Sequence, residues 1–420
     1  MVKIALVVPE YRTESGAGGG ITTMADSILE DLALEPGWTT DVISLRMSRR
    51  APQSARLLAP HTWFRGPILE ERRWGATRVI DVGSHLAEFE TFRYLPRRSL
   101  DRLLGKYDIA VVVSGSPAPA VALRRMHMPI VSYPATLIAA ERQSLLATAR
   151  GPRRIFLSLN TWVTSKLDEV GLAIADSVMV INPWMLEQCV RRGMADTVLA
   201  PPGIDTDFFR PAARALQDGY ILTVSRLSDP RKRIGDLIRA YKVAIELDPS
   251  IPRLVLAGRE QPAEADLRLI AGLELSDHIE VLAPVDPENL ASIYQGASLF
   301  VLPSSEEGLG IVLLEAMACG LPVISTETEG GKYVISTPPI GGRLVSLGLG
   351  VESRLAEMLV RLSRDAILRN NLGLEGRERV LNTFSHRAAK ERLKGVIEKS
   401  IAQNMHWDAL RGQANRPVRQ

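Results

Sequence analysis

Short apolar runs alternate along the chain with longer amphipathic segments, and this alternation is typical of βαβ units. Most of the runs are apolar at every position, which predicts strands that helices cover on both faces of a parallel sheet. The predicted strands are Lys3–Val8, Asp41–Leu45, Ile109–Val113, Ile130–Ser132, Val178–Ile181, Val198–Ala200, Tyr220–Val224, Leu254–Ala257, Ile279–Leu282, Leu299–Leu302 and Val323–Ser325. The pattern therefore indicates an α/β protein with many parallel strands.

Three segments depart from this alternation. Between Met47 and Arg102 the periodicity is poor and Pro, Arg and Trp are frequent, which predicts a long irregular insertion. The run Pro201–Pro211 combines prolines with a glycine just before a new α/β pattern, so we expect a domain junction there. From His386 to about Leu410 apolar residues recur at helical spacing, and the polar last ten residues are predicted to be disordered.

The length of 420 residues suits two domains. The breaks in the pattern predict a first domain over 1–205 with the insertion at about 46–102, a second domain over 206–385, and a C-terminal helix and tail over 386–420. No run reaches the length of a membrane span, and because no basic and apolar leader pattern precedes the first strand, we expect no secretory leader. The two cysteines match no metal-ligand spacing, so we expect reduced thiols in a cytoplasmic protein.

The net charge of +3 conceals an asymmetry along the chain. Residues 46–154 hold nineteen Lys/Arg and eight Asp/Glu, a local charge of +11 that leaves −8 for the rest. This excess favours contact with phosphates, anionic lipid head groups or an acidic acceptor, or else forms a solvated Arg-rich surface. Aromatic residues such as Trp63 and Trp74 lie among these arginines, which fits an interfacial membrane patch, a sugar-stacking groove or a small loop core. No nucleic-acid recognition fold is evident.

The most informative stretch is Leu299–Thr326, which reads as strand, loop, helix and strand. The helix is predicted over about Leu309–Cys319, because Gly320 and Pro322 follow it. Glycines at its start allow a ligand to approach the backbone closely, and the first-turn amides favour an anion. Two glutamates in this stretch, Glu307 and Glu315, would lie roughly 12 Å apart if the segment were helical throughout. They therefore suit two ends of one extended ligand.

The string from Glu307 through Glu315 to Gly320-Leu-Pro-Val-Ile resembles the signature of family 4 retaining glycosyltransferases, which have the GT-B fold. The resemblance is strong over about 198–345 and weaker over 46–175. It implies two Rossmann-like doubly wound parallel-sheet domains facing across a cleft, with the C-terminal helix returning to the first. It also implies transfer of a hexose-type sugar from a nucleotide-diphosphate donor, without a metal or another cofactor.

Other family landmarks follow in the expected order. After the strand Tyr220–Val224, Arg226 and Lys232 are similar to the family's Arg…Lys element and would hold the donor diphosphate. A guanidinium and an ammonium can neutralise charge on a leaving phosphate without a metal. Gly19 and Gly20 resemble the family's Gly-Gly loop, which packs against the donor phosphates.

The resemblance also implies roles for the residues of the signature. Glu307 would lie at the transferred sugar, and Glu315 would bind the ribose hydroxyls. The sugar or phosphate oxygens would meet the amides of Gly308, Leu309 and Gly310. Retention is then explained by front-face attack, in which the leaving diphosphate helps to deprotonate the acceptor.

One position departs from the family. Relatives commonly carry a His after the fourth strand of the first domain, where this chain has Pro134, which offers no donor or ionisable group. Tyr133 and Thr136 are the nearest polar substitutes on the acceptor or sugar side. Two alternatives stay open as a result: a GT-B binding or scaffold subunit, and a sugar-nucleotide epimerase. The predicted partners are a nucleotide sugar, a glycan or lipid-linked acceptor, and peripherally the anionic inner face of the membrane.

Overall fold

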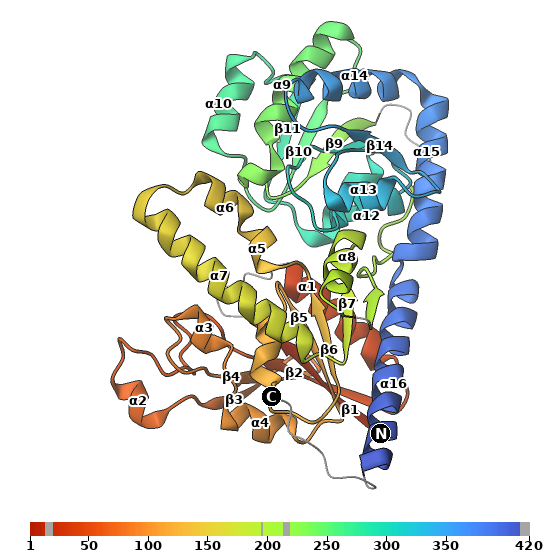
Figure 1. Ribbon diagram of the computed structural model, residues 1–420. Coiled ribbons are helices and arrows are strands. Elements are labelled where there is room, and N and C mark those ends of the chain that lie inside the picture. Colours follow the sequence, from red (N-terminus) through yellow and green to blue (C-terminus); the bar gives the residue numbers. More distant parts are fainter. Residues whose placement is uncertain (13–19, 195, 213–218, 412–420) are drawn as a thin grey trace. The chain divides into compact units, whose positions relative to one another are not determined.

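The computed structural model describes residues 1–12, 20–194, 196–212 and 219–411, and the chain divides into two compact units (Figure 1). The first unit contains Met1–Pro202 together with Lys390–Gln420, and the second contains Gly203–Ala389. Each unit has its own sheet and its own apolar core.

The first unit is built on an eight-stranded sheet of order β3-β4-β2-β1-β5-β6-β7-β8. All neighbouring strands are parallel except β3 and β4, which form an antiparallel hairpin. In chain order the strands are β1 (Val2–Val8), β2 (Trp38–Ser44), β3 (Leu69–Trp74), β4 (Thr77–Val82), β5 (Ile109–Ser114), β6 (Ile130–Pro134), β7 (Ser177–Val180) and β8 (Thr197–Leu199).

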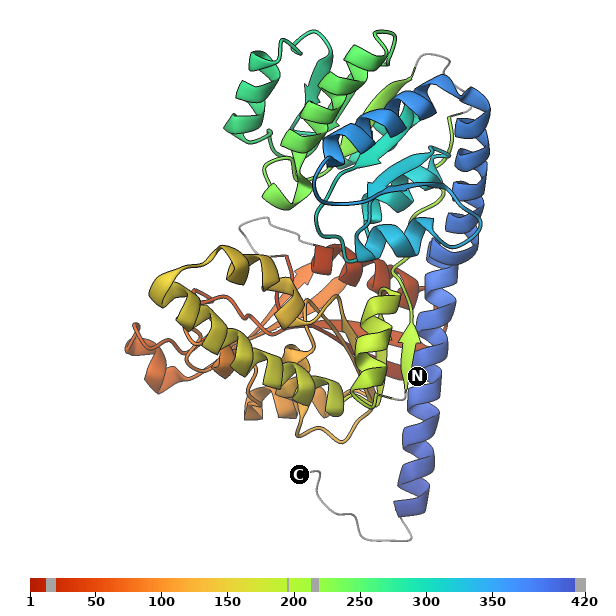
Figure 2. The same ribbon diagram turned by 45° about the horizontal axis from the view of Figure 1, so that its top comes forward.

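Helices connect these strands, as both views of the ribbon show (Figures 1 and 2). Strand β5 is buried at all six positions, because helices cover both faces of the sheet there. The helices are α1 (Gly20–Ala33), α2 (His61–Arg65), α3 (Glu90–Arg93), α4 (Arg98–Leu104), the 3₁₀ helix η1 (Ala118–Leu123), α5 (Ile138–Glu141), α6 (Gln143–Thr148), α7 (Gly151–Ala173) and α8 (Pro183–Arg191).

The second unit has a six-stranded, fully parallel sheet of order β11-β10-β9-β12-β13-β14. Its strands are β9 (Tyr220–Val224), β10 (Leu254–Ala257), β11 (Ile279–Leu282), β12 (Ala297–Leu302), β13 (Val323–Thr326) and β14 (Gly342–Val345). Its helices are η2 (Pro230–Lys232), α9 (Ile234–Leu247), α10 (Glu264–Gly272), η3 (Pro287–Asn289), α11 (Leu290–Gln295), α12 (Ile311–Ala318), α13 (Glu329–Ile335), α14 (Val351–Arg364), α15 (Ala366–Arg379) and the π-helical turn η4 (Val380–Phe384).

The C-terminal helix α16 (His386–Arg411) returns to the first unit, as predicted. Glu35, which follows α1, forms ion pairs with two lysines of α16: its Oε1 lies 2.9 Å from Lys390 Nζ, and its Oε2 lies 2.8 Å from Lys394 Nζ. Further along, the hydroxyls of Ser400 and Ser177 lie 3.1 Å apart. The predicted disordered tail lies outside the described residues.

The predicted irregular insertion over 46–102 is wrong in one respect, because it contains regular structure. The hairpin β3–β4 lies within it, and β4 pairs in parallel with β2. Strand β3 was missed because its sequence, LEERRW, is exposed at five of six positions and shows no apolar face. Its antiparallel pairing also corrects the expectation of a wholly parallel sheet. Strand β14 was missed because its sequence, GRLV, begins with glycine and arginine and so contains no apolar run.

Within the described ranges, no helix combines the length and the apolar composition that crossing a membrane requires.

Candidate functional site

The sheet of the second unit reverses its strand order between β9 and β12. The chain adds β10 and β11 on one side of β9, then crosses to the other side with β12, β13 and β14. In open α/β sheets, ligands bind beyond the carboxyl ends of the strands at such a reversal. The two loops that leave the strands here are residues 225–233 and 303–310. These loops carry most of the residues that the sequence singled out.

Lys232 and Glu307 meet at this point although they are 75 positions apart in the sequence. Lys232 Nζ lies 2.5 Å from Glu307 Oε1, and Ser304 Oγ donates a 2.7 Å hydrogen bond to the same oxygen. The two charged side chains are only 14% and 12% exposed. Charges withdrawn from water to this degree need partners, and here each supplies the other. An ammonium has three donor hydrogens, so Lys232 can also serve an anionic ligand.

The flanking cations have other partners. Arg231 Nη2 lies 2.8 Å from Asp229 Oδ2, and Arg233 Nε lies 2.5 Å from Asp236 Oδ2. Of the three consecutive cations, Lys232 is therefore the one that pairs with Glu307. Arg226, at the start of the same loop, is 63% exposed, and its Nη2 lies 2.9 Å from Asp229 Oδ2. The guanidinium has five N–H donors, which leaves several directed toward solvent.

The loop after β12 is held in place by backbone contacts. Ser305 N donates to Arg231 O at 2.8 Å, which joins this loop to the loop after β9. Gly330 N, at the start of α13, donates to Glu307 O at 2.9 Å. A Cβ on Gly330 would lie 2.6 Å from the carbonyl carbon of Leu309, so only glycine allows this approach. The side chain of Leu309 is buried, so its backbone alone is available to a ligand.

The helix that follows begins later than predicted. Helix α12 starts at Ile311 rather than at Leu309, because Gly310 has a φ of +79° and left-handed backbone cannot continue a right-handed helix. The amides of Gly308, Leu309 and Gly310 therefore belong to the loop that enters α12 and not to its first turn. Their role in binding stays a prediction.

Glu315 lies on α12 beside a buried tyrosine. Tyr294, on α11, is fully buried and donates a 2.6 Å hydrogen bond to Glu315 Oε2. Protein surrounds the Glu315 carboxyl, although part of the residue's surface is accessible. This burial raises the pKa of Glu315 to about 7, and the hydrogen bond from Tyr294 offsets only part of the effect. Glu315 can thus accept or donate a hydrogen bond near neutral pH.

Three residues that support this arrangement were not predicted. Ser304 stands three positions before Glu307, and a hydroxyl at that spacing was a usable signal. Tyr294 and Gly330 carry no such signal, because they come from separate helices whose packing creates their contacts.

The site residues predicted on the first unit do not contact one another as those of the second unit do. Gly19 lies outside the described residues, and Gly20 is the exposed first residue of α1. Tyr133 is only 3% exposed and its hydroxyl donates to Ala200 O, so it packs inside the unit, contrary to the prediction that it faces an acceptor or sugar. Pro134 ends β6, and Thr136 follows in the next loop, where its backbone N–H donates to Gly115 O at 2.9 Å.

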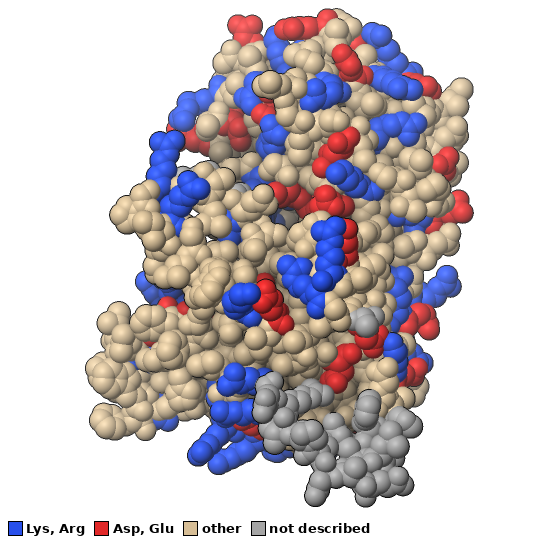
Figure 3. All heavy atoms as spheres, viewed as in Figure 1, with Lys and Arg blue, Asp and Glu red and all other residues tan. Residues whose placement is uncertain are grey.

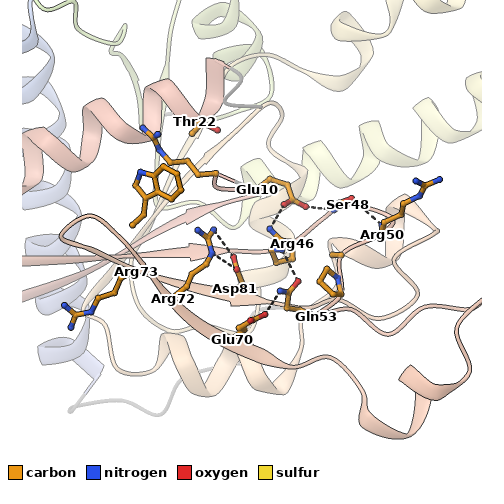
Figure 4. A pocket seen from close by; sticks show the side chains of 14 residues that line it. Glu10, Thr22, Arg46, Ser48, Arg50, Gln53, Glu70, Arg72, Arg73 and Asp81 are labelled. Atoms are coloured by element: carbon orange, nitrogen blue, oxygen red, sulfur yellow. Dashed lines mark hydrogen bonds and ion pairs between the residues drawn. The ribbon is translucent and has the colours of Figure 1, made fainter. Parts of the chain in front are cut away.

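A polar cavity of about 730 Å³ lies in the first unit, and the sequence did not predict it (Figure 4). Its walls come from the carboxyl ends of the neighbouring strands β1, β2 and β4, together with the β3–β4 hairpin. Eight charged residues dominate the lining: Arg12, Arg46, Arg50, Arg72, Arg73, Glu10, Glu70 and Asp81. Such a position is where parallel sheets bind ligands.

Ion pairs fix part of the cavity wall. Arg72 Nε lies 2.8 Å from Oδ2 of Asp81, which is almost completely buried. Glu10 Oε1 accepts a hydrogen bond from Ser48 N at 2.5 Å, whereas its Oε2 lies 3.4 Å from Arg46 Nη1 and forms no hydrogen bond. Burial raises the pKa of Glu10. A buried carboxylate oxygen without a hydrogen bond can accept one from a ligand.

Comparisons with known proteins point to the same part of the chain as the site in the second unit. Residues 205–379 match the family model described as "Glycosyl transferases group 1". The chain is 32% identical to a GDP-mannose-dependent monoacylated alpha-(1-6)-phosphatidylinositol monomannoside mannosyltransferase of Corynebacterium glutamicum, over 47% of this chain and 55% of that protein. It is 28% identical to a D-inositol 3-phosphate glycosyltransferase of Saccharomonospora viridis, over 59% of each chain. The alignments thus span a little over half the length of these relatives.

Among solved structures, sucrose-phosphate synthase of Thermosynechococcus elongatus superposes with a TM-score of 0.67 at 23% identity, over 96% of this chain and 100% of that one. This likeness concerns the fold and confirms the predicted GT-B class, with two Rossmann-like units. The family model covers the whole site of the second unit, from Arg226 to Gly330. Over residues 205–379, which form most of the second unit, the chain is thus similar to the group 1 glycosyl transferases.

Proposed function

We propose that this protein is a glycosyltransferase that moves a sugar from a nucleotide-diphosphate donor to a glycan or lipid-linked acceptor. The observation that carries the proposal is the largely buried Lys232–Glu307 pair at the strand reversal of the second unit. A lysine held beside a carboxylate at the carboxyl ends of parallel strands can receive a diphosphate, while the carboxylate receives the sugar hydroxyls.

The remaining residues take complementary roles in this proposal. The exposed guanidinium of Arg226 and the ammonium of Lys232 neutralise the charge that builds on the leaving diphosphate. Glu315 binds the ribose hydroxyls, and the amides around Leu309 bind sugar or phosphate oxygens. Two cations at the diphosphate support a reaction without a metal. We further propose that the anomeric configuration is retained, with the leaving diphosphate taking the proton of the acceptor.

A nucleotide-sugar binding assay tests the proposal directly. Isothermal titration calorimetry of the full chain against GDP-mannose, UDP-glucose and UDP-N-acetylglucosamine should show binding of at least one donor, with the same affinity in the presence of EDTA. GDP-mannose belongs in the panel because one relative is named for it. If no donor binds, the chain is a scaffold subunit. If a donor is converted to an epimeric nucleotide sugar without any acceptor, the chain is an epimerase.

We propose that the polar cavity of the first unit holds the acceptor. Its charged lining offers both donors and acceptors to hydroxyl-rich molecules, and Trp74 at its edge is 48% exposed. An exposed aromatic ring beside polar groups is suited to stacking on the apolar face of a sugar or polyol. The guanidinium carbon of Arg12 lies 5.0 Å from the centre of the same ring and holds it in place.

Replacing Trp74 with alanine should therefore raise the KM for the acceptor about tenfold, which corresponds to losing part of the burial energy of one aromatic side chain. The donor dissociation constant should stay unchanged. Leu69→Ala is a matched control, because Leu69 is 45% exposed on the same hairpin and does not line the cavity. Steady-state kinetics with varied acceptor measures the effect, and an unchanged acceptor KM in Trp74→Ala would remove the cavity from the acceptor site.

A further inference from the structure

Helix α7 buries polar side chains and exposes apolar ones, the reverse of a normal surface helix. On its buried side lie Thr161, Thr164, Asp168, Gly171 and Leu172, of which only the last is a large apolar residue. On its opposite side Ile155, Phe156, Leu159 and Trp162 are between 61% and 73% exposed. At ~100° per residue these four occupy about one third of the helix circumference.

Hydrogen bonds inside the unit hold the polar side of α7. Asp168 accepts hydrogen bonds from Ala118 N at 3.0 Å and from Ile138 N at 2.8 Å. Asn160 Nδ2 donates to Glu90 Oε2 at 2.9 Å, and Glu90 also pairs with a neighbouring arginine. These bonds fix the rotation of the helix, so the apolar stripe cannot turn inward. The stripe is therefore a stable feature of the surface.

Cations accompany the stripe. Arg150, Arg153 and Arg154 are exposed at the start of α7, and the described residues provide none of them with an ion pair. From Arg150 to Val163 the chain contains no acidic residue. A helix with an apolar face of Trp, Phe and Leu and with arginines nearby is typical of segments that lie in the interfacial region of an anionic membrane.

A second exposed apolar group lies at and before α2. Phe64 is 97% exposed, Leu58 is 87% exposed, and Trp63 is 53% exposed, with Arg65 beside them. Both α2 and the start of α7 project toward the left of the first unit in the two ribbon views (Figures 1 and 2). The space-filling view shows mostly uncharged atoms over the α2 region, at the lower left (Figure 3). Two apolar projections in one direction can touch one flat surface.

We propose that the apolar stripe of α7, together with the second exposed apolar group at α2, docks the protein onto an anionic lipid bilayer. A second copy of the chain would place these unpaired arginines near their own equivalents, and such like charges repel. A bilayer with anionic head groups instead accepts the apolar side chains and pairs with the arginines. This docking would operate whether or not the acceptor is itself a lipid.

The test uses vesicle co-sedimentation of the full chain, with phosphatidylcholine vesicles that contain or lack phosphatidylglycerol. The wild type should bind the vesicles with phosphatidylglycerol and bind the neutral ones at least tenfold more weakly. The variant Phe156→Ser/Leu159→Ser/Trp162→Ser should lose binding to both. Replacing Arg153 and Arg154 with serine should weaken binding to the anionic vesicles about fivefold per arginine.

A matched control is Ile367→Ser/Leu374→Ser on α15, since these residues are 77% and 65% exposed in the second unit. This control should bind vesicles like the wild type. All variants should keep the wild-type circular dichroism and donor affinity, so failure of the docking and failure of the proposed function give different results. The proposal is overturned if the wild type does not bind the anionic vesicles. It is also overturned if the triple α7 variant keeps its vesicle binding, or if that variant instead abolishes a dimer seen by analytical ultracentrifugation.

Discussion

Replacing Lys232 with methionine should lower kcat/KM for sugar transfer by about 10²–10³-fold, the usual effect of removing one preorganised group that stabilises transition-state charge. Methionine keeps most of the length of the lysine stem and removes the charge. In the free protein the ammonium contacts Glu307 at 2.5 Å, so the site already holds the cation in position before a donor arrives. Glu307→Gln should also reduce kcat/KM, because it removes the charge that orients Lys232.

A loss of catalysis in these two variants can be distinguished from a loss of folding. Lys242→Met is a matched control, because Lys242 pairs with Glu246 at 3.8 Å on the exposed side of α9 in the same unit. It should leave kcat/KM within a factor of about two, as expected for a surface ion pair. A double-mutant cycle between Lys232→Met and Glu307→Gln should show strong coupling, because the residues share one contact. Wild-type rates in both single variants would rule out this pair as the centre of catalysis.

Apart from β14, the sequence predicted the strands of the second unit closely, because most positions of these buried parallel strands are apolar. The strand Tyr220–Val224, for example, has the predicted bounds. It did not predict β3, because an exposed edge strand needs no apolar face. The sequence also did not predict that α7 exposes its apolar side chains. Periodicity shows that a helix has an apolar face, but it does not show whether that face points to the core or to solvent.

The candidate site divides in the same way. Glu307, Glu315 and the glycines between them lie in one short segment, so their sequence alone suggested a common site. The contact of Lys232 with Glu307 depends instead on the adjacency of β9 and β12 in the sheet, which the linear pattern does not contain. The polar cavity was missed for a related reason. Its walls join loops that run from Glu10 to Asp81, and no local motif marks them.

Glu315→Gln should make the protein more stable at pH 8 by about 3–4 kcal/mol while changing its stability little at pH 4. The wild-type carboxyl has a pKa of about 7 in the folded protein, because burial disfavours its charged form. In the unfolded chain the value is about 4.3. Between these values the unfolded chain has released its proton and the folded protein still holds it, so the free energy of unfolding falls as pH rises.

Glutamine removes this pH dependence but can still accept the hydrogen bond from Tyr294, which is why it is the substitution of choice. Urea denaturation followed by circular dichroism at several pH values measures the difference, and Glu357→Gln on the exposed side of α14 is the control that should show none. The donor provides a second measurement. If ribose hydroxyls donate to Glu315, binding favours its ionised form, so the wild type should bind the donor more tightly as pH rises through 7. Glu315→Gln should lose that dependence. A wild-type stability profile that matches the variant at every pH would show that the carboxyl is solvated, and a pH-independent donor affinity would separate Glu315 from the ribose.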